Sequence, residues 1–172
     1  MKRLSKYIIV AMLFVCVACS TKTSELPAEY NVVAAKPKIY PDYSDVVVPC
    51  NIAPLVFRVT EEGDDFVTRL AAGDKAFVYG GREVAPAVDD WHSLLTQAVG
   101  GKIDVEVYAA KAGSWEKFEP FSIAVSGDSI DRYISYRLIP PSYVAYEKLT
   151  ISQRDLSGFE ESVIYNNKFI SA

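Results

Sequence analysis

Two hydrophobic patterns divide the chain. Residues 7–18 form one continuous apolar run, whereas from about residue 39 onward apolar and polar residues alternate within short segments. Because successive side chains of a strand point to opposite faces, such alternation predicts strands with one buried face. The clearest case is residues 102–111, where every second position from Ile103 to Ala109 is apolar. Most of the chain is therefore predicted to be β-structure.

Further strands are predicted where a short β-branched or aromatic run lies between polar turns. They are residues 45–50, 55–60, 66–72, 75–81, 115–125, 133–139 and 148–156. The polar turn at residues 61–65 indicates that the strands on either side of it form a hairpin. A polar, aromatic tail is expected after residue 156.

One segment has the period of a helix instead. Its apolar residues Trp91, Leu94, Leu95 and Ala98 are spaced i, i+3, i+4 and i+7, and so share one helical face. Asp89 or Asp90 is predicted to cap the N-terminus of this helix, and Gly100 and Gly101 are predicted to end it. A single short helix among strands is expected to cover one end of the core.

The predicted elements define the fold class. Roughly seven short strands with turns about every 8–12 residues are typical of a β-sandwich. No strand–helix–strand alternation is present, which argues against a parallel α/β sheet. Residues 39–172 are therefore predicted to form one all-β, antiparallel β-sandwich domain, immunoglobulin or fibronectin III-like, with one short helix.

The N-terminus predicts a secretory signal. Basic residues at positions 2, 3 and 6 precede the apolar run, which is too short to span a bilayer as a helix. The run ends Val17-Ala18-Cys19-Ser20, which resembles a bacterial lipobox. Residues 1–18 are therefore predicted to be a lipoprotein signal peptide, and Cys19 to be the lipidated residue. An ordinary cleaved signal and an uncleaved membrane anchor remain as alternatives.

The segment after Cys19 is interpreted as a flexible tether. Residues 19–38 are polar, contain Pro27 and Pro37, and show no sustained periodicity. Several acyl chains on one cysteine give stable anchoring without a membrane-spanning helix. The lipid anchor is accordingly the expected contact with the membrane.

Charge excludes one class of partner. The predicted signal peptide contains three of the 18 basic residues and none of the 22 acidic ones, which leaves 15 basic against 22 acidic residues and a net charge of −7. Nucleic-acid binding requires a basic surface, so it is not expected. The same acidity argues against adsorption on anionic lipid through the protein surface.

No arrangement of residues predicts catalysis, a cofactor or a metal. Cys50 is the only cysteine after the predicted signal and lipid site, and His92 is the only histidine. Cys50 is expected to be a buried small hydrophobic residue, with intermolecular pairing and a reactive thiol as alternatives. His92 has no second soft ligand near it in sequence, and is expected to take a surface or capping role. The protein is therefore predicted not to be an enzyme.

Aromatic residues crowd the C-terminal part of the sequence. The candidate contact residues are Trp115, Tyr133, Tyr136, Tyr143 and Tyr146. Tyr and Trp combine apolar area with a polar group, so such a cluster on a sandwich edge could stack on sugar rings or bind a partner strand. The alternative is that half of these rings fill the core and the rest cover its rim.

Several motifs resemble one group of proteins. The stretches "IYPDYSDVVVPCNIAPLVFRV" and "SLLTQAVGGKIDVEVYA", followed by "YISYRLIPPSY", "QRDL" and "VIYNN", are similar to the leading part of Bacteroidetes envelope lipoproteins. Longer members of that group continue into a haem-type Cys-x-x-Cys-His segment and a TolB-like β-propeller. This chain ends at Ala172 without either, so nothing carried by those parts is transferred.

Together, these features predict a lipid-anchored, non-enzymatic interaction module of the bacterial cell envelope. The expected place is the outer membrane, on either its periplasmic or its surface face. The expected partner is a propeller or another envelope protein, and the chain is interpreted either as a free-standing module or as the leading part of a longer lipoprotein. The alternative function is that of a surface glycan-binding accessory lipoprotein.

Overall fold

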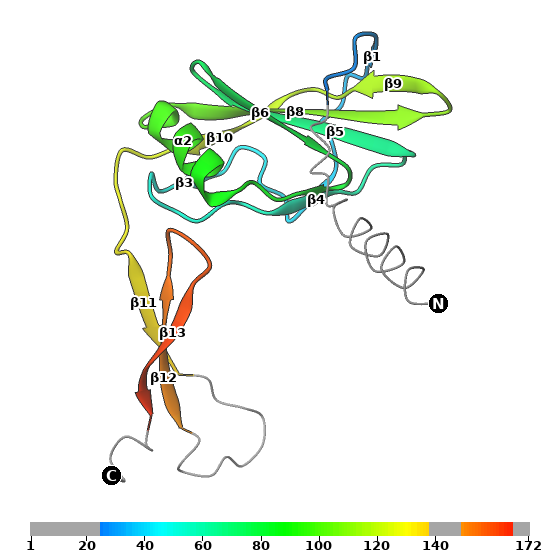
Figure 1. Cartoon of the computed structure of the whole chain (residues 1–172). Helices are drawn as coiled ribbons and strands as arrows, with labels where there is room; N and C mark the ends of the chain where they lie inside the picture. The colour runs from blue at the N-terminus through cyan, green and yellow to red at the C-terminus, as the bar shows by residue number, and fades with distance from the viewer. Residues whose placement is uncertain (1–24, 138–148, 167–172) are drawn as a thin grey trace, which may run out of the picture.

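The computed structural model describes residues 25–137 and 149–166. The predicted signal peptide, Cys19, Tyr143 and Tyr146 lie outside these residues. The predicted fold class is confirmed: the described residues are mostly β, with two sheets packed as a sandwich and, within these residues, one short helix (Figure 1). The structure adds a third, separate sheet and two parallel strand pairs that the sequence did not predict.

The larger sheet is built around β8. Its seven strands are β1 (Asn31–Val32), β3 (Val47–Val48), β5 (Asp65–Ala72), β6 (Lys75–Gly80), β8 (Lys102–Lys111), β9 (Ser114–Lys117) and β10 (Phe121–Val125). Strand β8 pairs with β5 along one side, and with β9 and then β10 along the other. The two short strands β1 and β3 are added in parallel to β9 and β10. The alternation of β8 is confirmed, because Ile103, Val105, Val107 and Ala109 are all buried.

The smaller sheet lies across the core from the larger one. Its strands, in spatial order, are β2 (Ile39–Tyr40), β4 (Phe57–Val59) and β7 (Glu83–Val84). Phe57 of this sheet meets Phe121 of the larger sheet edge to face, with ring centroids 6.5 Å apart. The two sheets therefore share one hydrophobic core.

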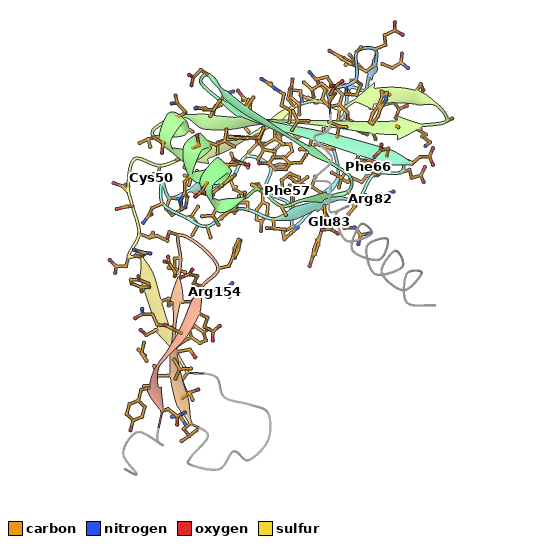
Figure 2. All side chains as sticks on the ribbon, viewed as in Figure 1. Cys50, Phe57, Phe66, Arg82, Glu83 and Arg154 are labelled. Carbon is orange, nitrogen blue, oxygen red and sulfur yellow. The ribbon has the colours of Figure 1, made fainter. Side chains whose placement is uncertain are left out.

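The predicted hairpin at residues 55–72 is wrong. Strand β4 belongs to the smaller sheet and β5 to the larger one, so the turn between them carries the chain across the sandwich. Arg82 holds this corner, because its guanidinium donates hydrogen bonds to the carbonyls of Glu61 at 2.7 Å and Gly63 at 2.9 Å. The same group lies 4.2 Å from the centroid of the Phe66 ring (Figure 2).

Helix α2 (Val88–Ala98) packs against β5, β6, β8 and β10 and covers one end of the core, as predicted. The four residues of its predicted apolar face, Trp91, Leu94, Leu95 and Ala98, are all buried. The predicted cap is wrong: the N-cap is Ala87, without a side-chain hydrogen bond, and Asp89 and Asp90 lie in the first turn. Their carboxylates face the positive end of the helix dipole there.

The predicted tether differs from the structure in its second half. Residues 31–32 form β1, and the chain remains bonded beyond it, with Val33 N donating to Lys117 O at 2.9 Å. Glu119 N then donates to Ala35 O at 2.9 Å, and Pro37 is buried. The backbone of this segment extends the sheet, which is why polar composition alone did not reveal it.

The third sheet projects from the sandwich (Figure 1). It is a meander of β11 (Tyr133–Tyr136), β12 (Thr150–Asp155) and β13 (Glu161–Asn166), with β12 in the middle. Strand β13 lies in the region predicted to be a tail. The prediction of one sandwich over residues 39–172 therefore describes the chain only as far as β10.

Candidate functional site

The base of the third sheet is held by a buried carboxylate. Asp155 is only 7% exposed, and its Oδ2 accepts a hydrogen bond from Arg132 Nε at 2.9 Å. Its Oδ1 accepts from the Ser157 hydroxyl at 2.6 Å and from the Ser157 N–H at 2.8 Å. Arg132, followed by Ser157, lowers the pKa of Asp155 from 3.8 to about 2. The charged form is therefore part of the folded junction.

Acid should weaken this junction. Because the pKa of Asp155 is lower in the folded state, its contribution to stability is fully present above pH 3.8 and is lost as the pH falls toward 2. Asp155→Asn should remove this contribution. Melting temperatures of the two proteins should differ most above about pH 4 and converge toward about pH 2. A difference that stays constant across this range would contradict the assignment.

The sandwich forms hydrogen bonds with the base of the third sheet. Ala53 N donates to Leu156 O at 2.7 Å, and the Asn51 side chain both donates to Ile130 O at 2.8 Å and accepts from Ile130 N at 3.0 Å. His92 Nε2 on α2 lies 2.8 Å from Ser157 O. The one histidine of the chain thus joins the two parts of the molecule.

Beyond this base, the third sheet exposes large apolar side chains. They are Tyr133, Ile134, Ile151, Val163, Ile164 and Tyr165, with exposed fractions from 36% to 52%. The strand register places Ile134 and Val163 on one face and Tyr133 and Tyr165 on the other. Among residues 25–137 and 149–166, this sheet contains no strand beyond β11, β12 and β13, and none of the extensive contacts between elements joins it to another strand or to the helix.

The structure separates the predicted aromatic cluster. Tyr133 and Tyr136 lie together on β11, but Trp115 lies on β9 of the larger sheet, at the other side of the molecule (Figure 1). Tyr133 is about half exposed beneath the Arg132 guanidinium, 5.1 Å from the ring centroid. Tyr136 is hydrogen-bonded to Glu161, which raises the pKa of its phenol. The two tyrosines thus contribute to the third sheet, and Trp115 does not.

Sequence reasoning missed the apolar residues of β13. Val163, Ile164 and Tyr165 are consecutive, and the register skips Ile164 opposite the Ile151–Ser152 step of β12. A bulge of this kind breaks the period of two on which strand prediction depends. The signal that could have revealed the strand is the β-branched and aromatic composition of these residues.

The described residues offer little for other chemistry. Cys50 is half-buried beside the core, with its Sγ 4.0 Å from Gly127 O. In residues 25–137 and 149–166, no three His, Cys, Asp or Glu side chains come close enough together to bind a metal ion. Over the same residues, no helix combines the length and the apolar character that a membrane span requires.

Comparisons with known proteins leave the family open. The chain matches no protein-family model, no curated protein and no solved structure.

Proposed function

We propose that this protein is a lipid-anchored, non-enzymatic module of the bacterial cell envelope, which docks on another envelope protein through its third sheet. The observation that carries the proposal is the apolar surface of β11, β12 and β13, which has no covering layer among the described residues. A partner that covers these exposed apolar side chains would remove them from water and so gain binding energy.

The base of the sheet supports the same role. Arg132, Asp155 and Ser157 form a hydrogen-bonded cluster, and the sandwich contacts Leu156 and Ser157 directly. The surface is therefore held in one orientation before a partner arrives, which reduces the entropy lost on binding. Lipidation of Cys19 would place this surface at a membrane, where its partner is also expected.

The test uses a photo-crosslinking amino acid in the full chain within the source bacterium. Placed at Ile164 of β13, it should give one adduct of discrete mass in the membrane fraction. Placed at Val47 of β3, which is 70% exposed but lies on the sandwich, it should give none. Equal adducts from both positions, or no adduct from either, would contradict the proposal.

Two further arms separate docking from anchoring. Ile164→Asp should abolish the adduct of a crosslinker at Tyr165, while the melting temperature changes little, because about half of the Ile164 side chain already faces solvent. In cells fed labelled palmitate, the wild-type chain should be labelled and Cys19→Ala should not. If the wild-type chain without a crosslinking residue takes up no label, the proposal of a lipid anchor on Cys19 is wrong, whatever the crosslinking results show.

A further inference from the structure

A second surface feature lies on the larger sheet, apart from the third sheet. It is a pocket of about 620 Å³ between the segment that leads into β1 and the turn that joins β8 to β9. Its lining includes Glu29 and Tyr30 before β1, Asn31 at the start of β1, and Ser114 and Trp115 at the start of β9. This volume lies within the range of pockets that hold small ligands.

The wall formed by Tyr30 is built before any ligand arrives. The Tyr30 ring packs edge to face on the buried Tyr108, with centroids 5.4 Å apart and planes at 73°. Lys117 Nζ lies 5.5 Å from the Tyr30 centroid and 5.3 Å from that of Tyr108. The Glu106 carboxylate fixes this ammonium at 2.5 Å. These contacts hold Tyr30 against the sheet.

The Trp115 ring is positioned to contact a ligand in the pocket. It is two residues from Lys117 along β9, so both side chains leave the same face of the sheet. The residue directly opposite Trp115 on β8 is Ala110, which is too small to cover an indole. Trp115 is accordingly half-buried and lines the pocket rather than the core.

The lining selects one class of ligand. Within the described part of the chain, its only saturated side chains are those of Pro27 and Ala28, so an aliphatic peptide side chain would gain few contacts there. Among the described residues, no lysine or arginine lines the pocket, while Glu29 does, so an anionic ligand is disfavoured. The lining also contains the aromatic side chains of Tyr30 and Trp115 beside carboxylate, amide and hydroxyl groups, and this combination suits a neutral ring that carries many hydroxyls.

We propose that this pocket binds a neutral oligosaccharide. The Trp115 indole packs on the C–H face of one sugar ring. The side chains of Glu29, Asn31 and Ser114 bond its hydroxyl groups. This binding does not involve the third sheet, so it can be tested independently of the docking proposed above.

The two tryptophans of the chain make the test selective. Trp91 is fully buried and its Nε1 donates to Ile52 O at 3.0 Å, so its emission should not respond to a ligand at the surface. A change in emission during titration therefore reports Trp115. The full-length protein should be titrated with a panel of neutral oligosaccharides in a detergent without a sugar headgroup, because a glycosidic headgroup would compete for the pocket.

At least one sugar of the panel should change the Trp115 emission, with an affinity that calorimetry confirms. Trp115→Ala should weaken the binding of this sugar about tenfold, which is near the upper value for loss of one aromatic stacking contact. Asn31→Ala should weaken it less, and Tyr40→Ala, which removes a 73% exposed ring elsewhere, should leave it unchanged. Circular dichroism should show all three variants folded.

Two results would overturn the proposal. One is that no sugar of the panel changes the emission or gives heat at millimolar concentration. The other is that a sugar binds folded Trp115→Ala as tightly as the wild type. Loss of binding in Tyr40→Ala but not in Trp115→Ala would place the sugar elsewhere and would also refute this site.

Discussion

Replacement of Trp91 by alanine is expected to lower the free energy of unfolding by about 3–5 kcal/mol. The indole is fully buried where α2 closes the core, and it contributes both packing and the hydrogen bond to the Ile52 carbonyl. Alanine would leave a cavity beneath the helix and an unpaired carbonyl at its edge. Because Ile52 lies between Asn51 and Ala53, which bond to Ile130 and Leu156, the base of the third sheet should loosen as well.

Urea unfolding followed by far-UV circular dichroism measures this change. Trp91→Phe restores most of the ring volume but not the hydrogen bond, so it should cost less, about 1–2 kcal/mol. Tyr40→Ala, at a 73% exposed position, should stay within about 0.5 kcal/mol of the wild type. Equal midpoints for Trp91→Ala and Tyr40→Ala would show that α2 does not close the core.

Arg82→Met is expected to cost about 2–4 kcal/mol. The guanidinium donates to the carbonyls of Glu61 and Gly63, with a longer bond of 3.3 Å to Val59 O, and it covers the Phe66 ring. Methionine keeps much of the length of the side chain but leaves these carbonyls without their donor. The corner where the chain crosses between the two sheets should therefore open before the rest of the structure.

The matched control is Arg58→Met on β4. The Arg58 side chain is 59% exposed and forms an ion pair with Glu83 at 3.5 Å, so its loss should change stability by less than about 0.5 kcal/mol. Arg82→Lys should recover little, because a single ammonium cannot span carbonyls that the planar guanidinium bridges. Urea midpoints of the three variants test this order, and full recovery by lysine would refute the bridging role.

The elements that the sequence predicts well are those long enough to show a period. Strand β8 and helix α2 each bury every apolar residue of their predicted face. Strands β1, β2 and β7 have only two residues each, too few for any period. The hairpin prediction failed for a different reason, because the Arg82 contacts that turn the chain across the sandwich come from about 20 residues away in sequence.

The candidate surfaces were predictable only in part. Composition indicates aromatic contact residues, and Tyr133 and Tyr136 do share a strand. Trp115 is joined instead by Tyr30 and Asn31, from a segment that the sequence predicts to be a tether. The parallel pairing of Asn31 with Glu116 brings these residues together, and pairing between segments so distant in sequence leaves no local signal.

If Cys19 carries the proposed lipid, the pairing of β1 with β9 limits how far the sandwich can lie from the bilayer. From residue 19 to residue 30, even a fully stretched backbone reaches only about 35–40 Å. A lipid on Cys19 would therefore be connected to the sandwich by a segment scarcely longer than the width of a small domain. A chain anchored in this way would bind its partner close to the lipid headgroups.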